Sequence, residues 1–150
     1  MSFRKIVQGA SFISAAAAAV IMGAGPAAAA TNWQEVNTNS NWYCESTKQH
    51  NPYSGVGFQG CVVQNSSGDA QVVLVVVNNG PKAVRIGGSI SSGFGSNTTC
   101  AASVLNPGFQ RGCFAPTKSL KCNILYGAQV NVIINDTINS GTTMTANRPC

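Results

Sequence analysis

The stretch Val72-Val73-Leu74-Val75-Val76-Val77 decides the fold, and it leads directly into Asn78-Asn79-Gly80-Pro81. Five of its six apolar residues are β-branched. Such side chains lose rotamer freedom in a helix but pack well on a pleated sheet, so the run predicts a buried strand. Asn and Gly tolerate positive φ, and Pro81 has no N–H for a central ladder. Residues 78–81 therefore predict a reversal of the chain before a second strand that begins near Val84.

Short strands separated by turn residues continue on both sides of this pair. After Pro81, apolar side chains alternate with polar or small ones, the period-2 pattern of a strand with one buried face. Residues 91–99 predict a loop with an exposed Phe94, and Asn106-Pro107-Gly108 suits a type II turn. We expect the other strands at residues 33–36, 58–64, 100–105, 109–114, 120–126, 130–134 and 142–150, with a turn at Gly127. Turn signals recur about every 10–13 residues, which predicts an all-β sandwich.

The first thirty residues have the pattern of a secretory signal peptide. Arg4 and Lys5 form a short positive start, residues 13–22 are apolar, and four alanines occupy residues 27–30. Small residues surround signal-peptide cleavage sites, so we place the cut after the last of these alanines. The apolar stretch is too short and Ala-rich to anchor in a bilayer, and we expect no membrane span. The prediction is a secreted, extracellular protein whose mature part, residues 31–150, is one domain.

The charge of the mature chain is low. Without Arg4 and Lys5, seven Lys and Arg stand against four Asp and Glu, which gives a net charge of +3 spread along the sequence. A nucleic-acid footprint would need a stripe of basic residues, so we expect no nucleic-acid partner. The single histidine, the absence of an acidic cluster and the lack of a Gly-rich phosphate loop predict neither a metal nor a cofactor.

The six cysteines all lie in the predicted mature part: Cys44, Cys61, Cys100, Cys113, Cys122 and Cys150. An even number in an exported chain, with no Cys-x-x-Cys pair, indicates three disulfides. We favour sequential pairing, 44–61, 100–113 and 122–150, because each bridge would close a moderate loop between neighbouring strands. Each would contribute roughly 2–4 kcal/mol. A crossed pairing such as Cys100–Cys122 is the main rival.

Two features resemble those of bacterial immunoglobulin-like and fibronectin-type-III-like sandwich modules. One is a Val-rich strand ending in Asn-x-Gly, here Val75–Gly80 followed by Ala83-Val84, and the other is Leu-x-Pro-Gly, here Leu105–Gly108. The signal peptide and cysteine use also resemble those of small secreted proteins of actinobacterial type. The resemblance implies an immunoglobulin-like, Greek-key β-sandwich. The chain departs from antibody domains in having six cysteines instead of a single inter-sheet pair, and no function follows from the fold.

Residues suited to catalysis are few. His50 is the only histidine, and its polar loop predicts a solvated ring. Every cysteine is expected to be oxidised and therefore useless as a nucleophile. The acids of the mature chain are Glu35, Glu45, Asp69 and Asp136, and their spacing suggests no catalytic carboxylate pair. The sequence therefore predicts a protein that is not an enzyme.

One candidate for binding is the stretch from Asn106 to Thr117. It carries Phe109, Arg111 and Phe114 between Pro-Gly and Pro-Thr, where a disulfide would brace it. Secreted inhibitors present rigid segments of this kind, because pre-ordering lowers the entropic cost of binding. This interpretation predicts an extracellular protein partner, most concretely a hydrolase that the chain inhibits. The alternative is an ordinary hairpin whose Arg111 is solvated.

A second candidate lies near the amino end, where aromatic residues are interspersed with Asn and Gln: Trp33, Trp42, Tyr43 and Tyr53. Aromatic rings can stack on sugar rings while amides bond to their hydroxyls. These residues therefore form an alternative site, for a glycan or a cell wall. The simpler interpretation is that Trp42 and Tyr43 cover the core beside Cys44.

The valine run has one apolar row too many for a strand with a solvated outer face. Either another segment of the chain covers that row or a partner does, a second copy of the chain included. Together these patterns predict a secreted, disulfide-stapled β-sandwich that acts by binding.

Overall fold

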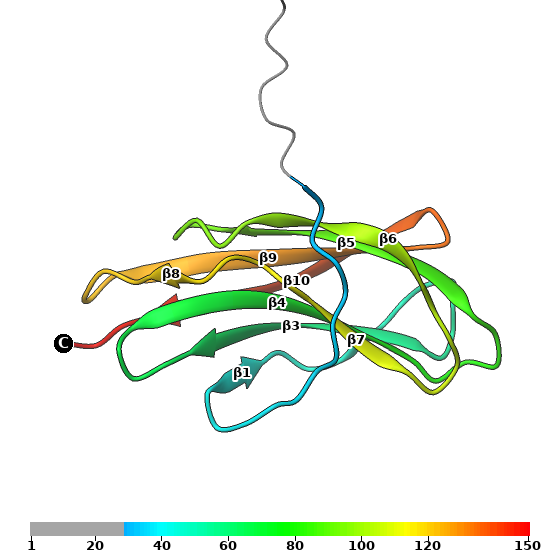
Figure 1. The fold of residues 1–150 in the computed structure, drawn as a ribbon, viewed down its shortest axis with the longest axis horizontal. Coiled ribbons are helices and arrows are strands. Elements are labelled where there is room, and N and C mark those ends of the chain that lie inside the picture. Colours follow the sequence, from blue (N-terminus) through cyan, green and yellow to red (C-terminus); the bar gives the residue numbers. More distant parts are fainter. Residues whose placement is uncertain (1–28) are drawn as a thin grey trace, which may run out of the picture.

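The computed structural model describes residues 29–150, apart from the side chains of residues 139 and 140. The predicted signal peptide lies outside these residues, except for its last two. Among these described residues, ten strands form two antiparallel sheets, so the predicted all-β sandwich is confirmed (Figure 1). Within the described residues, no helix is long and apolar enough to cross a membrane.

The first sheet is built around β4, which carries the valine run. Its order is β1 (Trp42–Cys44), β3 (Val56–Gln64), β4 (Asp69–Asn78) and β7 (Gln110–Phe114), while β2 (Lys48–Gln49) pairs with β3 and β8 (Lys118–Ser119) with β4. The order of the second sheet is β10 (Thr137–Asn147), β9 (Leu125–Ile134), β5 (Val84–Ser92) and β6 (Thr98–Leu105). The immunoglobulin-like Greek-key arrangement stays a prediction.

The strands run lengthwise between two ends of the sandwich (Figure 1). At one end, here called the Asn78 end, lie the connections 79–83, 106–109 and 135–136. At the other, the C-terminal end, lie the connections 65–68 and 120–124 and residues 148–150. Surfaces at the two ends are therefore separated by the length of the sheets.

The main core lies between the two sheets, and alternate residues of β4 face it. Val72, Leu74 and Val76 are fully buried there. The opposing sheet contributes the inward-facing side chains of β5 and β9: Ile86, Ile90, Ala128, Val130, Val132 and Ile134. Both strands therefore have the period-2 burial that the sequence predicts.

The second row of the valine run is buried as well, on the outer face of the first sheet. Val73 and Val75 form a small cluster with Cys61, and Val36, Trp42 and Phe114 pack over it. The Trp42 and Phe114 rings meet edge to face, with their centroids 5.9 Å apart. The chain itself thus covers this row, as one of the two interpretations predicts, and no partner is needed to bury it.

The reversal after β4 is a crossover between the sheets, because β4 and β5 belong to different sheets. Positive φ is not used at Asn78, Asn79 or Gly80. The buried Asn78 side chain holds the turn instead. Its Nδ2 donates to the carbonyl oxygens of Lys82 (2.8 Å) and Leu105 (3.0 Å), and its Oδ1 accepts from the Gly80 N–H (3.0 Å).

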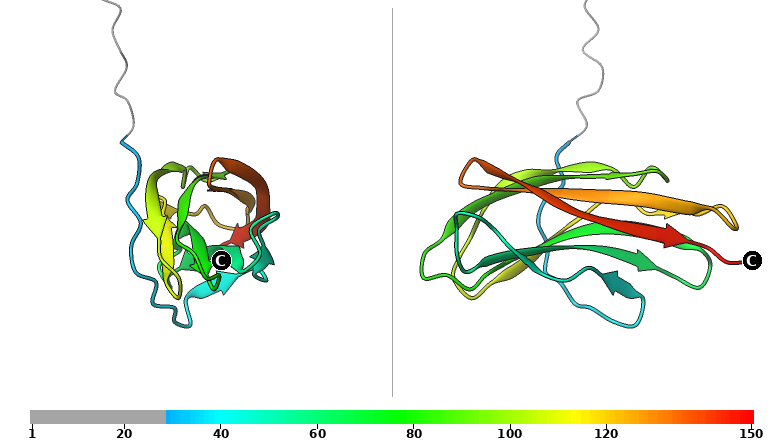
Figure 2. Two further views of the ribbon diagram at one scale, coloured as in Figure 1. Left: turned by 90° about the vertical axis from the view of Figure 1, so that its right-hand side faces the viewer. Right: turned by 180° about the vertical axis from the view of Figure 1, so that it is seen from behind.

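The N-terminal segment, residues 31–36, crosses one open side of the sandwich (Figure 2). Thr31 bonds to β6 through Thr99 and Ala101, and Gln34 exchanges two backbone bonds with Gly112 of β7. The predicted strand at 33–36 is therefore wrong. The segment makes one isolated bridge to each sheet, since a chain that passes from one sheet to the other cannot extend either ladder.

The stretch from 120 to 127 also differs from its prediction. Asn123 adopts φ +57°, which breaks the predicted strand, and the next strand begins only at Leu125. Gly127 makes no turn and lies within β9. Phe94, predicted to be exposed, is half-buried against Tyr126, with the ring centroids 5.7 Å apart.

The three disulfides are those of the sequential pairing, which is confirmed. Cys44–Cys61 ties β1 to β3, Cys100–Cys113 ties β6 of one sheet to β7 of the other, and Cys122–Cys150 fixes the C-terminus. The cysteines of Cys100–Cys113 are both buried, whereas those of Cys122–Cys150 are exposed.

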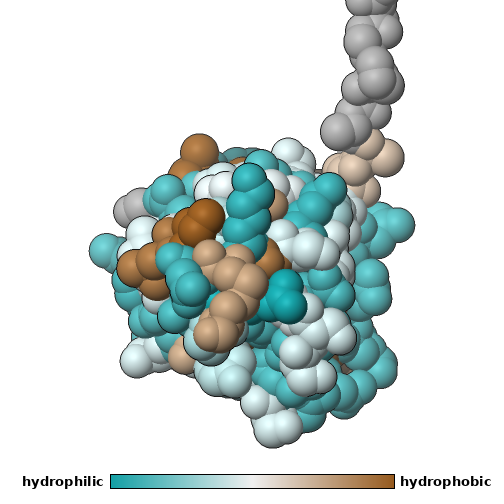
Figure 3. Space-filling view, turned by 90° about the vertical axis from the view of Figure 1, so that its left-hand side faces the viewer, coloured by the Kyte–Doolittle hydropathy of each residue, from teal (hydrophilic) through white to brown (hydrophobic). Residues whose placement is uncertain are grey.

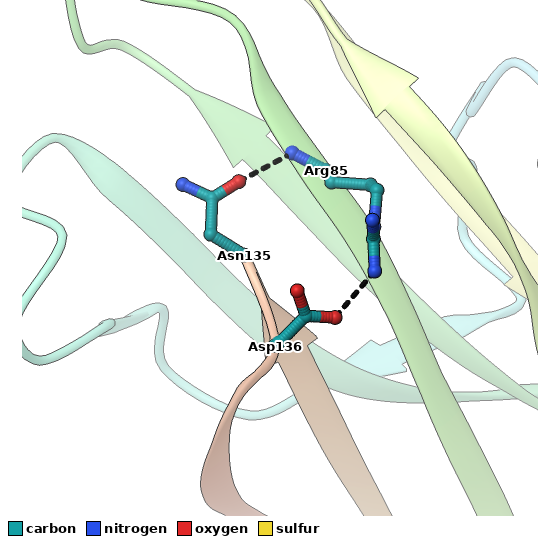
Figure 4. Close-up of polar contacts among 3 residues, drawn as sticks. All are labelled: Arg85, Asn135 and Asp136. Atoms are coloured by element: carbon teal, nitrogen blue, oxygen red, sulfur yellow. Dashed lines mark hydrogen bonds and ion pairs between the residues drawn. The ribbon is translucent and has the colours of Figure 1, made fainter.

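The β9–β10 turn is fixed to β5 by two contacts with Arg85, here called the clasp: one to its main chain and one to its side chain (Figure 4). Asn135 and Asp136 both have positive φ, which these residue types tolerate better than most. Asn135 Oδ1 accepts from the Arg85 N–H (2.8 Å), and Asp136 forms an ion pair with the Arg85 guanidinium. This clasp places Asp136 at the Asn78 end, whereas Asp69 lies at the C-terminal end.

Candidate functional site

The turn between β6 and β7 places Phe109 at the surface of the Asn78 end. Leu105 is buried in the core, and Pro107 and Gly108 reverse the chain, with Gly108 at φ +80° as a type II turn requires. The Gly108 N–H donates to the Asn78 carbonyl (2.7 Å), and the Asn78 N–H donates to the Phe109 carbonyl (3.0 Å). This anchoring to β4 leaves the Phe109 side chain 49% exposed.

Arg111 lies beside Phe109 and packs against it. The guanidinium carbon is 5.2 Å from the centre of the Phe109 ring, which is within cation–π range. Nη1 donates to the Gln110 carbonyl oxygen (2.8 Å). Arg111 is a half-buried residue of β7. The contact residue of a substrate-like inhibitor would project from a loop, and Arg111 does not.

Three connections hold this pair rigidly. The Cys100–Cys113 disulfide joins the two strands that flank the turn, with 5.9 Å between the Cα atoms. The Asn78 amide holds the end of β6 through Leu105, and β7 pairs with β4 along its length. We call Phe109 and Arg111 the turn surface.

Phe114 does not belong to the turn surface. It pairs with Val73 in the β4–β7 ladder, so its side chain points to the outer face of the first sheet, where it meets Trp42. Arg111 pairs with Val76, whose side chain faces the core between the sheets. The sequence predicts one contact surface that combines Phe114 with Phe109 and Arg111. The alternation of β7 instead puts Phe114 on the opposite face of the sheet from Arg111.

The four aromatic residues of the glycan alternative do not come together either. Trp33 donates from Nε1 to the Ala101 carbonyl oxygen (2.7 Å) and packs on the main core, while Trp42 covers the valine row. Tyr53 lies at the Asn78 end beside His50. Only Tyr43 is free at the surface, with 63% of its side chain exposed.

A groove opens near Tyr43 at the C-terminal end, with a volume of about 740 Å³. Its walls come from β1 and β3 of the first sheet and from β10 and the C-terminal residues of the second. Gln64 Nε2 donates to the Asn147 carbonyl oxygen (2.9 Å) across the gap between the sheets. The sequence holds no local signal for this groove, because residues 64 and 147 meet only through the tertiary fold.

Figure 3 looks onto the C-terminal end and shows apolar side chains gathered on part of a mostly polar surface. Ile124, just before β9, and Leu125, its first residue, are large apolar residues exposed at this end, as is Tyr43. Leu125 pairs with Asn147 of β10, so it stands next to one wall of the groove.

No family model matches this chain, and no curated protein matches it. The resemblance to immunoglobulin-like modules therefore stays a prediction.

The His50 ring is 2% exposed, so the predicted solvated histidine is wrong. The His50 N–H donates to the Val56 carbonyl (2.8 Å), which closes the loop between them, and the Tyr53 ring of this loop lies against the His50 ring with the centroids 5.6 Å apart. Neither ring nitrogen has a hydrogen-bond partner among the described residues. Burial lowers the pKa of His50, and the nearby Thr137 backbone opposes this effect more weakly.

The carboxylates of the described residues are dispersed. Ser119 and Asn65 donate hydrogen bonds to Asp69, which lower its pKa, and Arg148 adds a smaller effect in the same direction. Within residues 29–150, no group of three or more His, Cys, Asp or Glu side chains could hold a metal ion.

Proposed function

We propose that the chain is an exported, non-catalytic protein that binds an extracellular protein through the turn surface. The observation that carries this proposal is the exposed Phe109 ring with Arg111 stacked on it, on a disulfide-braced turn. Aromatic and Arg side chains dominate the binding energy of protein interfaces. Because the disulfide and the Asn78 bonds order this turn before binding, little conformational entropy remains to be lost.

Export is supported by two independent features. The three disulfides within residues 29–150 suit an oxidising compartment, and the amino-terminal sequence has the pattern of a cleaved leader. Sequencing the amino terminus of the protein recovered from culture medium tests this part. We expect Thr31 as the first residue, and retention of the full chain inside the cell would contradict the proposal.

The non-catalytic part rests on the positions of the titratable groups. Asp69 begins β4 at the C-terminal end, whereas Asp136 follows β9 at the Asn78 end and is already engaged by Arg85. His50 has no hydrogen-bond partner to orient its proton among the described residues, as a general base requires. Binding is the activity that the remaining surface groups support.

A matched set of variants tests the turn surface. Extracellular hydrolases are screened for inhibition, and culture fluid is screened by affinity capture, with the wild type, Phe109→Ala, Arg111→Ala and Tyr43→Ala. Truncating a hot-spot residue of an interface costs about 2 kcal/mol or more, or roughly 30-fold in Kd. We expect both turn-surface variants to lose the partner to this extent, and Tyr43→Ala, at the opposite end, to bind as the wild type does.

The outcome that contradicts the proposal is a partner that both turn-surface variants bind with wild-type affinity. Thermal unfolding of each variant is the control for folding, since a side chain as exposed as Phe109 contributes little to stability. A variant that unfolds like the wild type yet no longer binds locates the interface at the turn.

A further inference from the structure

The groove at the C-terminal end has the dimensions and lining of a small-ligand site. Its volume of about 740 Å³ lies within the range of about 300–1,000 Å³ typical of ligand pockets. Nearly half of the residues that line it have uncharged polar side chains: Asn41, Gln64, Asn65, Ser66, Thr145 and Asn147. The groove is independent of the turn surface, which occupies the other end of the sandwich.

Tyr43 is a fixed aromatic platform at this groove. In β1, Trp42 packs over the Val73 cluster on the outer face of the first sheet, so the alternation of the strand places Tyr43 on the face that looks toward the second sheet, where it remains exposed at the edge. Cys44, the next residue, is bonded to Cys61 of β3, and Tyr43 itself pairs with Val62. The ring is thus exposed on a strand that cannot shift, and ordering it on binding costs little entropy.

The amides around Tyr43 are available to a ligand. Gln64 and Asn65 are engaged with Asn147 O and Asp69. By contrast, the side-chain amides of Asn41 and Asn147 make no hydrogen bond with any other described residue. Each offers one acceptor and two donors, the complement that neighbouring hydroxyl groups require.

Arg148 is the one residue with a charged side chain in the lining of the groove. Arg148 lies flat on the β3–β4 turn, because a Cβ built on Gly68 would stand 2.4 Å from its Cδ and Nε atoms. Its positive charge is felt by Asp69 of the same turn, whose pKa it helps to lower. The other polar side chains of the lining carry no charge and match the hydroxyl groups of a neutral ligand, and Arg148 is the one lining group that an anionic ligand would engage.

We propose that the groove binds a neutral glycan, with Tyr43 stacked on a sugar ring and the Asn41 and Asn147 amides bonded to its hydroxyls. An aromatic face suits the apolar C–H surface of a sugar, and paired amides satisfy hydroxyls that would otherwise lose water. The site lies outside the turn surface and requires no protein partner.

The test uses the mature, disulfide-bonded protein and three soluble hexasaccharides: one of glucose, one of N-acetylglucosamine, and one anionic probe containing glucuronate. Calorimetry measures the binding of each to the wild type, Tyr43→Ala, Tyr43→Phe and Phe109→Ala. We expect a neutral probe to bind, and Tyr43→Ala to weaken it by at least about ten-fold. Tyr43→Phe keeps the ring and should bind within about two-fold of the wild type, and Phe109→Ala should be unchanged.

Three results would overturn the inference: no binding of either neutral probe at millimolar concentration, equal binding by the wild type and Tyr43→Ala, or binding of the anionic probe alone. Loss of glycan binding with the turn surface still active would leave the proposed function standing. The converse result would leave the groove standing, so the two failures are distinguishable.

Discussion

His50 occupies a site that offers no hydrogen bond to its ring within the described residues. Because burial lowers its pKa, the folded protein resists protonating this ring, whereas the unfolded chain accepts the proton near the ordinary value of about 6.5. Between that value and the lower folded-state pKa the unfolded chain binds more protons, so acid favours unfolding. Above about pH 6.5 both states are neutral and the effect vanishes.

We therefore predict that the free energy of unfolding falls as the pH drops below about 6.5, by no more than about 1.4 kcal/mol per pH unit for one proton. His50→Gln, which cannot titrate, should remove this slope, whatever its effect on absolute stability. Urea unfolding of the wild type and the variant at a series of pH values measures the slope and the absolute stability of each. Asp69 also loses stabilising interactions in acid, but only as the pH falls through the range of a carboxyl group. A slope near pH 6 that persists in His50→Gln would contradict the assignment.

Two adjacent glycines of β5 make a residue-scale test of packing. A Cβ on Gly88 would lie 2.4 Å from the Asn131 carbonyl oxygen and 2.6 Å from Leu74 Cδ2, whereas on Gly87 it would only touch Ile133 at 3.9 Å. We expect Gly88→Ala to cost about 1–3 kcal/mol or more, since backbone and core must shift. Gly87→Ala should stay within about 1 kcal/mol of the wild type. Equal effects in chemical denaturation would refute this packing.

At the scale of elements, β1 is a three-residue strand whose neighbouring aromatic residues have opposite roles. Trp42 covers the outer valine row, and Tyr43 faces solvent. We predict that Trp42→Ala destabilises the protein by about 1–3 kcal/mol, less than for a fully buried ring, and Tyr43→Ala by at most about 0.5 kcal/mol. Equilibrium unfolding of the two variants checks this, and a larger effect at Tyr43 would show that the strand is turned over.

The disulfides differ in what their removal should cost. Loop-closure entropy alone makes Cys122–Cys150 the more stabilising bridge by about 0.7 kcal/mol. Its cysteines are 28 residues apart, whereas those of Cys100–Cys113 are 13 apart. Replacing the buried sulfurs of Cys100–Cys113 by Ala leaves cavities worth about 1 kcal/mol each, which outweighs that difference. We predict that the Cys100→Ala/Cys113→Ala variant is the less stable of the two double variants. Thermal unfolding without reductant decides the order.

Much of the fold follows from local patterns. The valine run, the period-2 rows and the turn at Pro107-Gly108 depend on nearest neighbours and are recovered from the sequence. The strand predicted for 120–126 fails because positive φ at Asn123 outweighs the alternation around it. His50 misleads for a related reason, since a polar loop indicates solvent while the tertiary packing buries the ring.

The candidate sites divide in the same way. Phe109 and Arg111 are two residues apart, so their pairing is readable from the sequence. The separation of Phe114 from them requires the β4 register, which fixes the face of each β7 residue. The groove combines Tyr43 with residues of β10 that are about a hundred positions away, and no sequence spacing reports such a meeting.

For the whole molecule, the N-terminal segment closes one side of the sandwich. It bonds to both sheets, and its Val36 packs over the outer valine cluster. A chain that starts at Asn37 would lack Trp33 and Val36, so the apolar surface that these side chains cover would be exposed. The facing edges of β6 and β7 would also lose their hydrogen bonds to the segment. We predict a loss of about 2–4 kcal/mol and stronger self-association than in the wild type, because freed edges and apolar surface pair with a second copy.

Sedimentation and urea unfolding of the shortened chain test this prediction. Glu35→Ala is the control within the same segment, since its side chain is exposed and should leave both properties unchanged. A shortened chain that is monomeric and as stable as the wild type would show that the N-terminal segment contributes nothing to closure.

β4 is buried on every side, and this matters for a chain that we propose to be exported. An uncharged run of β-branched residues has the composition of amyloid-forming segments. In the native protein β3 and β7 occupy both of its edges and apolar side chains cover both faces, so no template is offered to another molecule. No cysteine lies within β4. Protection of this strand from fibril formation therefore comes from its neighbours, and it is weakest while a newly made chain has yet to fold around it.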